Sequence, residues 1–501
     1  MTNRLRPVAP LPAATEPSQA TSVVLNDVHS RLNRTEAGAL HPIGSLPALR
    51  TAVTAARGGR ISVAGGRHAM GGQQFTSGGT VLDTSDMSRV LLLDRQRGLV
   101  EVEAGIQWPE LVDRLHAAQR GASEQWTIAQ KQTGANRFSI GGSVSANCHG
   151  RGLTMGPIVS DVEALRVVTA DGSVVTCSRT RNRELFACVI GGYGLFGAIY
   201  SVTLRLAPRQ LLQRIVEVIS VDDLVAAVDA RVRDGFRYGD FQFAIDPHSA
   251  DFLRRGVFSC YRPVEADRPI PDRQVTLSPD DWLDLLQLAH QDKHRAFDVY
   301  AQHYLATSGQ LYWSDSHQLA VYLDDYHEGL DRRLGEVETG TEMITEVYVP
   351  RHRLPDFMAA AAQELRRLEA DLIYGTVRFT EADPDTYLPW ARQAYACVVF
   401  NLHTPHTPAG VARSATAFRR LIDLATAREG SYYLTYHRWA TPEQLLACYP
   451  QFPSFLALKR RYDPDELFYS DWYAHFRHLA GAAPTPWRQQ PPDSAAIRSV
   501  R

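Results

Sequence analysis

Three glycine-rich segments constrain the fold of this chain more than any other feature. They read AGGRHAMGG at 64–72, TGANRFSIGGSVSANCHGRG at 133–152 and GGYGLFG at 191–197. The third contains the GxGxxG pattern of dinucleotide-binding folds, which requires a strand before the glycines and a helix after them. Here a helical pattern, ELFACVI, comes first, and an alternating strand pattern, AIYSVTLRL, follows. The sequence therefore excludes a Rossmann-type site at this position.

The first two glycine-rich segments are candidates for binding a diphosphate. Each follows a strand pattern, and each offers consecutive backbone amides that could form an anion-binding concavity. Together they could enclose a long diphosphate ligand. The alternative is that their glycines only form tight turns in a strand-rich domain.

Length and charge limit the remaining possibilities. At 501 residues the chain exceeds the size of one hydrophobic core, which predicts two domains or one large discontinuous domain. Its 53 Lys and Arg residues nearly balance its 55 Asp and Glu residues. This balance gives no electrostatic case for a nucleic-acid partner or an anionic membrane surface.

Cysteine spacing and hydropathy indicate the compartment. The six cysteines are scattered without a CxxC pair, which predicts reduced, mostly buried thiols, no disulfide framework and no metal site. The amino terminus lacks the continuous apolar core of a signal peptide, and no segment is apolar for long enough to span a bilayer. We expect a cytoplasmic protein without a membrane span, whose oligomeric state the sequence leaves open.

The predicted secondary structure changes along the chain. We expect a flexible lead-in at 1–21, a strand-rich domain at 22–209, a domain with longer helices at 210–430, a segment that returns to the first domain at 431–480, and a flexible tail at 481–501. Ser45 is predicted to cap a helix that stops at Gly58, and Asp171-Gly172 to centre a hairpin. In RRYDPDELFYSDWYAHF, Asp463 and Pro464 predict the start of a helix.

The order of these elements resembles the FAD-binding domain of the PCMH-type flavoproteins, the vanillyl-alcohol oxidase superfamily. The resemblance covers residues 22–207, and YDPDELFYSDW is similar to the closing segment of those proteins. His149-Gly150 and LFYSDW are most similar to the alditol and aldonolactone oxidases and the decaprenylphosphoryl-ribose oxidases. The implied fold class is α+β, with an FAD-binding domain of two α+β subdomains and a separate α+β cap or substrate domain.

The resemblance also implies which residues contact FAD. The loop 64–72 would hold the pyrophosphate, and His68 stands where related oxidases bond a histidine to the C8 methyl of the flavin. Arg67 departs from the pattern, because covalent relatives commonly have glycine there, so a His68 that only hydrogen-bonds the cofactor stays an alternative. The implied cofactor residues are Ala64, Gly65, Gly66, Arg67, His68, Ala69, Met70, Ala104, Gly105, Ile106, Gly134, Asn136, Ser139, Gly141, Gly142, Ser145, His149, Gly150 and Ile199.

The implied activity is oxidation of a CH–OH group, on a sugar, polyol or hydroxylated small metabolite, by hydride transfer to flavin N5. Oxygen or another electron acceptor would then reoxidise the flavin. Arg378 could orient the substrate, and His403 or Tyr436 could act as base. Glu346 is a fallback, although an isolated acid in an alternating strand is more often a solvated residue than a catalyst. On strands, Thr376 would share a face with Arg378.

Two departures leave the substrate and the base open. Where alditol oxidases have glutamate and lysine, this chain has Thr376 and Tyr436. Two other functions therefore remain: a flavin-dependent reductase of a carbon–carbon double bond, similar to the sterol-reductase branch, and a flavoprotein in which the cofactor is structural.

Overall fold

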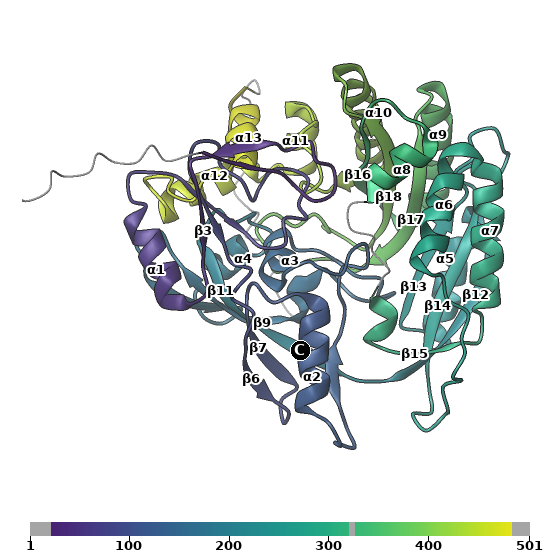
Figure 1. Ribbon diagram of the computed structural model, residues 1–501, viewed down its shortest axis with the longest axis horizontal. Coiled ribbons are helices and arrows are strands. Elements are labelled where there is room, and N and C mark those ends of the chain that lie inside the picture. The colour runs from purple at the N-terminus through teal and green to yellow at the C-terminus, as the bar shows by residue number, and fades with distance from the viewer. Residues whose placement is uncertain (1–21, 320–325, 483–501) are drawn as a thin grey trace, which may run out of the picture.

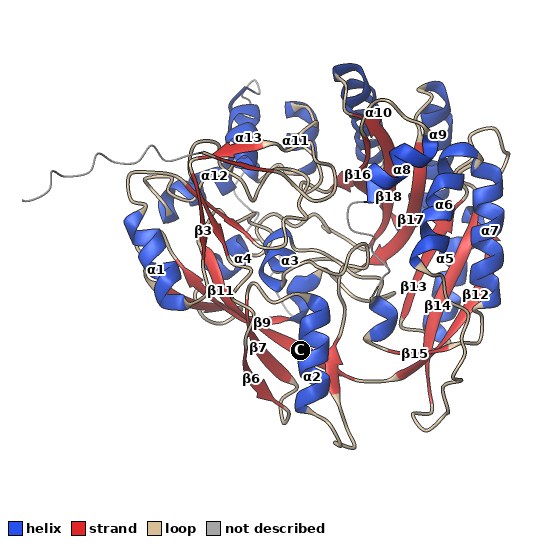
Figure 2. Ribbon diagram, in the orientation of Figure 1, coloured by secondary structure: helices blue, strands red, loops and turns tan. Residues whose placement is uncertain are grey.

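The computed structural model describes residues 22–319 and 326–482, and the predicted lead-in and nearly all of the predicted tail lie outside these residues. Figure 2 shows two larger β-sheets with a region of loops between them and helices around them. The chain is thus an α+β protein, as the sequence predicts.

The amino-terminal part of the chain forms the first larger sheet, which has six antiparallel strands. Its order is β10-β9-β11-β7-β6, and β8 pairs with β11. The strands are β6 (Val90–Asp94), β7 (Leu99–Glu103), β8 (Trp126–Ile128), β9 (Val162–Val168), β10 (Val174–Ser178) and β11 (Ala198–Pro208). The hairpin predicted around Asp171-Gly172 is confirmed, because it joins β9 to β10.

Two small sheets accompany this first one. Parallel strands β3 (Ala39–Pro42), β5 (Thr80–Asp83) and β4 (Ile61–Ala64) form one, and β1 (Val23–Leu25) pairs with β2 (Thr35–Ala37) in the other. The helices of this part are α1 (Leu46–Ala55), α2 (Trp108–Ala118), α3 (Ile140–Ala146), α4 (Arg183–Val189) and the 3-10 turn η1 (Ile158–Asp161). The Ser45 side chain accepts a hydrogen bond from the Ala48 amide, so the predicted helix cap is confirmed.

The GxGxxG segment lies between α4 and β11. A helix therefore precedes these glycines and a strand follows them, which confirms the order read from the sequence. This order is the reverse of a dinucleotide-binding turn, so the helix dipole that such a turn directs at a pyrophosphate is absent here.

Residues 211–432 build an eight-stranded sheet with the order β15-β12-β14-β13-β17-β18-β16-β19. All of its neighbouring strands are antiparallel. The strands are β12 (Leu211–Ser220), β13 (Tyr238–Phe243), β14 (Arg255–Val264), β15 (Leu311–Trp313), β16 (Gly340–Pro350), β17 (Leu372–Thr380), β18 (Tyr395–Pro405) and β19 (Ser431–Tyr432).

Helices surround this second sheet (Figure 1). They are α5 (Val221–Arg233), α6 (Pro279–Gln291), α7 (Lys293–Ala306), α8 (Tyr326–Leu334), α9 (Leu354–Arg367) and α10 (Pro408–Thr426), with 3-10 turns η2 (Ser316–Gln318) and η3 (Arg351–Arg353). The apolar side of α9 packs on the sheet through Phe357, whose ring centroid lies 6.4 Å from that of Phe400. The domain boundaries proposed at 209 and 430 stay a prediction.

The carboxyl-terminal segment contains helices α11 (Pro442–Cys448), α12 (Phe452–Tyr462) and α13 (Asp471–Ala482), and Phe468 after α12 forms a β-bridge with Ile61 of β4. The helix predicted to begin at Asp463 is wrong. Asp463 instead follows the last residue of α12, and its carboxylate accepts hydrogen bonds from the amides of Leu467 and Phe468 at 2.9 and 2.8 Å. Its ion pair with Lys459 is buried, and this pairing favours the turn over a new helix.

Two further predictions concern the burial of the cysteines and the presence of membrane-spanning helices. All six cysteines are buried, in agreement with the sequence. Within 22–319 and 326–482, none of the helices combines the length and the apolar character that a bilayer crossing requires.

Candidate functional site

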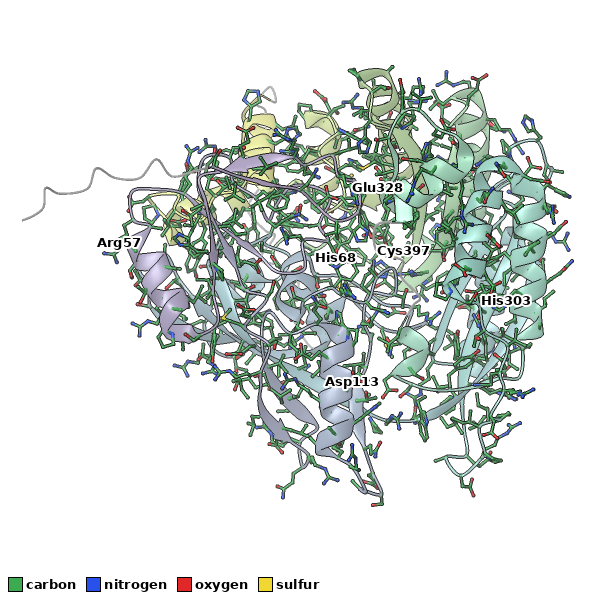
Figure 3. The ribbon with its side chains drawn as sticks, in the orientation of Figure 1. Arg57, His68, Asp113, His303, Glu328 and Cys397 are labelled. Carbon is green, nitrogen blue, oxygen red and sulfur yellow. The ribbon has the colours of Figure 1, made fainter. Side chains whose placement is uncertain are left out.

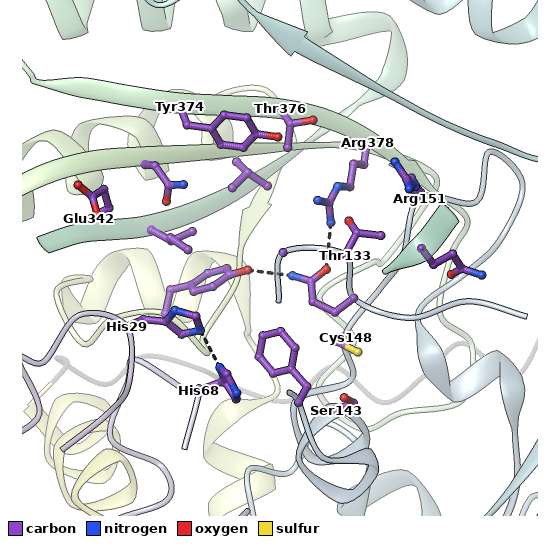
Figure 4. A pocket seen from close by; sticks show the side chains of 18 of the residues that line it. His29, His68, Thr133, Ser143, Cys148, Arg151, Glu342, Tyr374, Thr376 and Arg378 are labelled. Atoms are coloured by element: carbon purple, nitrogen blue, oxygen red, sulfur yellow. Dashed lines mark hydrogen bonds between the residues drawn. The ribbon is translucent and has the colours of Figure 1, made fainter. Parts of the chain in front are cut away.

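A cavity of about 700 Å³ lies between the glycine-rich loops and the eight-stranded sheet. Figure 4 shows side chains of β17 on one side of it and His29, His68, Ser143 and Cys148 on the other. His68 lies near the centre of the molecule in Figure 3, whereas Arg57, in the turn after α1, lies at the edge. The cavity thus joins the two parts of the chain that the sequence distinguishes.

The two glycine-rich loops pack directly on each other at one end of the cavity. A Cβ atom on Gly65 would lie 2.3 Å from the Ser139 hydroxyl oxygen, and one on Gly66 would lie 2.4 Å from the Arg137 carbonyl oxygen. Both distances are shorter than a non-bonded contact allows, so only glycine permits this approach. The glycines therefore serve to bring two loop backbones together along one wall.

His68 lies on that wall next to a second histidine. Its Nδ1 atom is 2.9 Å from Nε2 of His29, and its ring lies 4.5 Å from that of Phe138, centroid to centroid. Burial, aided by the charge of His327, lowers the pKa of His29 to about 4, so His29 is neutral near pH 7. Arg67 adopts φ 56°, a left-handed conformation that glycine adopts at lower cost.

Most of the predicted cofactor residues line the cavity. Those on its wall are Gly65, Gly66, Arg67, His68, Ala69, Met70, Ala104, Gly134, Ser139, Gly141, Gly142, Ser145 and Ile199. Ala64, Gly105, Ile106, Asn136, His149 and Gly150 are not part of the wall. Gly105 has a packing role instead, because a Cβ there would lie 1.9 Å from the Thr84 carbonyl oxygen.

Three buried polar atoms of the cavity wall have no hydrogen-bond partner among the described residues. They are Oε1 of Gln73, Oε1 of Gln74 and Oγ1 of Thr133, and all three residues line the wall. Buried polar groups are normally satisfied, so these atoms indicate a polar ligand. The residues present thus fit a cofactor with hydrogen-bonding groups, as FAD has.

Arg378 and Tyr436, two of the predicted catalytic residues, meet across the cavity through Gln132. The Arg378 Nη1 donates to Gln132 Oε1 at 2.9 Å, and Gln132 Nε2 donates to the Tyr436 hydroxyl at 3.3 Å (Figure 4). Burial raises the pKa of Tyr436 well above its ordinary value, and the charge of Glu346 adds to this effect. Tyr436 is therefore a neutral hydroxyl and a poor base.

His403 does not belong to the cavity wall, although it was predicted as a possible base. It lies on β18, and its Nδ1 atom is 3.7 Å from Oε1 of Glu342. Burial lowers the pKa of His403, but the Glu342 carboxylate more than offsets burial, so the pKa lies above its usual value.

Glu346 was predicted as a catalytic fallback or a solvated residue, and it is neither on the wall nor solvated. Its side chain is fully buried, and Oε1 accepts from Nε2 of His149 at 2.5 Å. His149, predicted to contact FAD, thereby links the loop after α3 to β16. The alternating pattern of β16 predicted an exposed side chain at Glu346. This prediction is wrong, because the loop after α3 covers the face of the strand on which Glu346 lies.

The sheet side of the cavity carries a second set of unpartnered polar atoms. In the part of the chain that the structure describes, these buried atoms have no hydrogen-bond partner: Oγ1 of Thr376, Nε of Arg378, Oδ1 of Asn401, and Oδ1 of Asp240 and Oε1 of Gln242 on β13. All five residues line the cavity, and Thr376 shares its face with Arg378 as the alternation predicts. These atoms include both hydrogen-bond donors and acceptors. A ligand with several hydroxyl groups suits them, because a hydroxyl can both donate and accept a hydrogen bond.

Four residues important to this geometry were not predicted: His29, Gln132, Asp240 and Gln242. Gln132 directly precedes the second glycine-rich segment, so its position was a signal that could have found it. Asp240 and Gln242 alternate along β13 between aromatic residues, a pattern that strands also show at exposed faces. His29 stands in a loop where nothing in the sequence marks it.

Comparisons with known proteins bear on which ligand this cavity binds. Residues 44–178 match the model of a family described as an FAD binding domain. An L-gulono-1,4-lactone dehydrogenase of Mycobacterium tuberculosis is 26% identical over 84% of this chain and 91% of its own. The bovine L-gulonolactone oxidase is 29% identical, and cytokinin dehydrogenase 2 of Arabidopsis thaliana is 31% identical, each over 38% of this chain.

The last two matches span 41% and 37% of those relatives, about two fifths of their length. The mycobacterial match, which covers 84% of this chain, necessarily includes part of the eight-stranded sheet. These matches support an FAD-dependent oxidoreductase in which residues 44–178 form an FAD binding domain, similar to gulonolactone oxidases and dehydrogenases and to cytokinin dehydrogenases.

Proposed function

We propose that the protein holds FAD along the glycine-rich wall and oxidises a CH–OH group of a sugar lactone or a similarly hydroxylated small molecule. The observation that carries this proposal is the row of buried, unpartnered polar atoms on β13, β17 and β18, which faces the loop of His68 across the cavity. Two of the relatives reported above act on gulonolactone, which is rich in hydroxyl groups.

FAD would be held by the residues of the two glycine-rich loops that line the cavity, with Ile199 on β11. FAD, when bound, supplies a two-electron acceptor for the hydride that leaves the substrate carbon. Backbone amides beside Gly65, Gly66 and Gly141 can approach a diphosphate closely, because no Cβ stands in the way. Residues 210–430 would form the cap over this cofactor.

Arg378 and Tyr436 would position the substrate. Gln132 fixes both, since its amide oxygen accepts from Arg378 and its amide nitrogen donates to Tyr436. The charged Arg378 then presents Nε to a substrate oxygen, and the neutral Tyr436 hydroxyl offers a hydrogen bond. Holding the reacting carbon in one place is the main catalytic contribution of such groups.

Substitution of Arg378 tests this assignment. Arg378→Ala removes a charge-assisted hydrogen bond, so we expect kcat/KM for L-gulono-1,4-lactone to fall about 10- to 100-fold while the flavin content stays that of wild type. Arg413→Ala, at an exposed position of α10, is the matched control and is expected to keep full activity. An unchanged kcat/KM in Arg378→Ala would remove Arg378 from the substrate site.

We also propose that His68 carries the flavin covalently. The support is its place on the cavity wall and its hydrogen bond to the neutral His29, which would hold the His68 ring in one orientation towards the flavin. After acid precipitation, the yellow colour should stay in the wild-type pellet and move to the supernatant for His68→Ala. Arg67→Gly, which keeps His68, should behave as wild type. Release of all flavin from the wild-type pellet would refute the linkage.

A further inference from the structure

A cluster of three histidines surrounds Glu342, which lies at an edge of the cavity. Glu342 lies on β16, and the histidines come from α6 (His290), α8 (His327) and β18 (His403). Oε1 of Glu342 is 3.5 Å from Nε2 of His290 and 3.7 Å from Nδ1 of His403. These residues are far apart in the sequence, which is why their spacing predicted no metal site.

The three facing atoms of this cluster are buried, and within residues 22–319 and 326–482 they have no hydrogen-bond partner. They are Oε1 of Glu342, Nε2 of His290 and Nδ1 of His403, and the exposed fractions of the three side chains are 7%, 8% and 13%. One atom from each residue lies within 4.8 Å of the other two. Three unsatisfied ligand atoms that face one point are costly to bury unless something lies between them.

The spacing of these atoms fits a metal ion better than direct hydrogen bonds. Both nitrogen-to-oxygen distances exceed the range of a good hydrogen bond. Zinc ligands at 2.0–2.2 Å in a tetrahedron stand about 3.4 Å from one another. The measured separations of 3.5 and 3.7 Å are close to that edge length.

We propose that His290, Glu342 and His403 bind a divalent transition-metal ion, with zinc as the preferred occupant. Two imidazoles and one carboxylate form a ligand set that suits zinc, and three protein ligands leave the fourth position open. Glu342 itself lines the cavity, whereas the two histidines stand behind it. The open position can therefore be reached from the cavity.

The surroundings of Glu342 hold its second oxygen in place. Oε2 is 3.0 Å from Nδ1 of His327 and accepts a hydrogen bond from the Tyr326 hydroxyl, so Oε1 is left for the ion. The ring of His403 lies over Gly340, where a Cβ would come within 2.2 Å of its Cε1 atom. Such outer contacts orient metal ligands in known sites.

The ion would bind an oxygen of the cavity ligand at this edge of the cavity. A hydroxyl, carbonyl or carboxylate oxygen can complete the coordination of zinc, so the site would take the part of the ligand that lies next to Glu342. Metal binding here depends only on the cluster, and its failure would leave the flavin proposal untouched.

Metal analysis of the untagged holoprotein tests the proposal. After equilibration with zinc chloride and removal of free ion, wild type should retain about one zinc per chain, and Glu342→Gln and His290→Gln should retain less than about a tenth of that. A chelator should lower the thermal midpoint of wild type and leave that of Glu342→Gln unchanged.

His294→Gln is the matched control, because His294 stands near the carboxylates of Asp246 and Asp298 but is 71% exposed. It should keep the wild-type zinc content. Circular dichroism and flavin content establish that each variant is folded, and His403→Gln supplies a third ligand variant if one of the others fails to fold. Wild type without zinc after this treatment, or equal zinc in folded Glu342→Gln, would overturn the metal site. The histidines and Glu342 would then be joined by shared protons alone.

Discussion

His437 shows how burial sets the protonation state of a single side chain. The Trp439 amide donates to its Nδ1 atom at 3.3 Å, so Nε2 carries the proton and donates to the Thr345 hydroxyl at 3.0 Å. Its ring packs against those of Phe418 and Trp439, at centroid distances of 5.0 and 5.4 Å. Burial, together with the charge of Arg419, lowers the pKa of His437 to about 3.

This pKa predicts how stability depends on pH. In the unfolded chain His437 becomes protonated below about pH 6.5, whereas in the folded chain it becomes protonated only near pH 3. The contribution to stability is therefore complete above pH 6.5 and is lost as the pH falls towards 3. From pH 7.5 to pH 5.5 this single group should cost about 1.4 kcal/mol.

Urea unfolding of wild type and His437→Gln at these two pH values measures the effect. The loss of unfolding free energy on acidification should be smaller in His437→Gln by that amount, since glutamine does not titrate. The exposed His352→Gln serves as control. Equal losses in wild type and His437→Gln would contradict the assignment.

At the scale of elements, the turn after α12 connects the end of the chain to the first glycine-rich loop. Asp463 holds this turn through two backbone amides and the buried ammonium group of Lys459. The turn then pairs with β4, because the Ile61 amide donates to the Leu467 carbonyl at 2.8 Å and the Tyr469 amide to the Ile61 carbonyl at 2.7 Å. Strand β4 leads directly into the loop 64–72.

We expect Asp463→Asn to destabilise the protein by about 3 kcal/mol, because it leaves the buried Lys459 charge without its partner. The exposed Asp465→Asn should change stability by less than about 0.5 kcal/mol. Thermal or urea unfolding measures both. The double variant with Lys459→Met should recover part of the loss, and a double variant as unstable as the sum of the single ones would show that the ion pair is not the cause.

Elements whose signal is local were predicted from the sequence. The helix capped by Ser45 and the hairpin at Asp171-Gly172 need only their own residues, and both form as expected. The helix start predicted from Asp463-Pro464 was wrong, because these two residues fit both the start of a helix and a turn that follows a helix. The buried Lys459 decides between them, and its burial depends on tertiary packing.

At the scale of the whole molecule, the sequence located the glycine-rich wall of the cavity but not its opposite wall in full. Close approach of two backbones requires glycine at particular positions, such as Gly65 and Gly66, and this requirement is visible in the sequence. Glu346 and His403 were misplaced, because neighbouring loops and strands decide which face of a strand is open to the cavity. The contacts of Glu342 with α6 and α8 depend on how those helices fold over the sheet.

The central claim is that a flavin in this cavity accepts hydride from a hydroxylated carbon. The direct measurement is the visible flavin absorption of the purified holoprotein, followed under anaerobic conditions as L-gulono-1,4-lactone and related lactones and polyols are added in turn. We predict that at least one of them bleaches the flavin band, and that the rate at which the band returns in air separates an oxidase from a dehydrogenase. Protein purified without flavin, or a flavin that none of these compounds reduces, would contradict the claim.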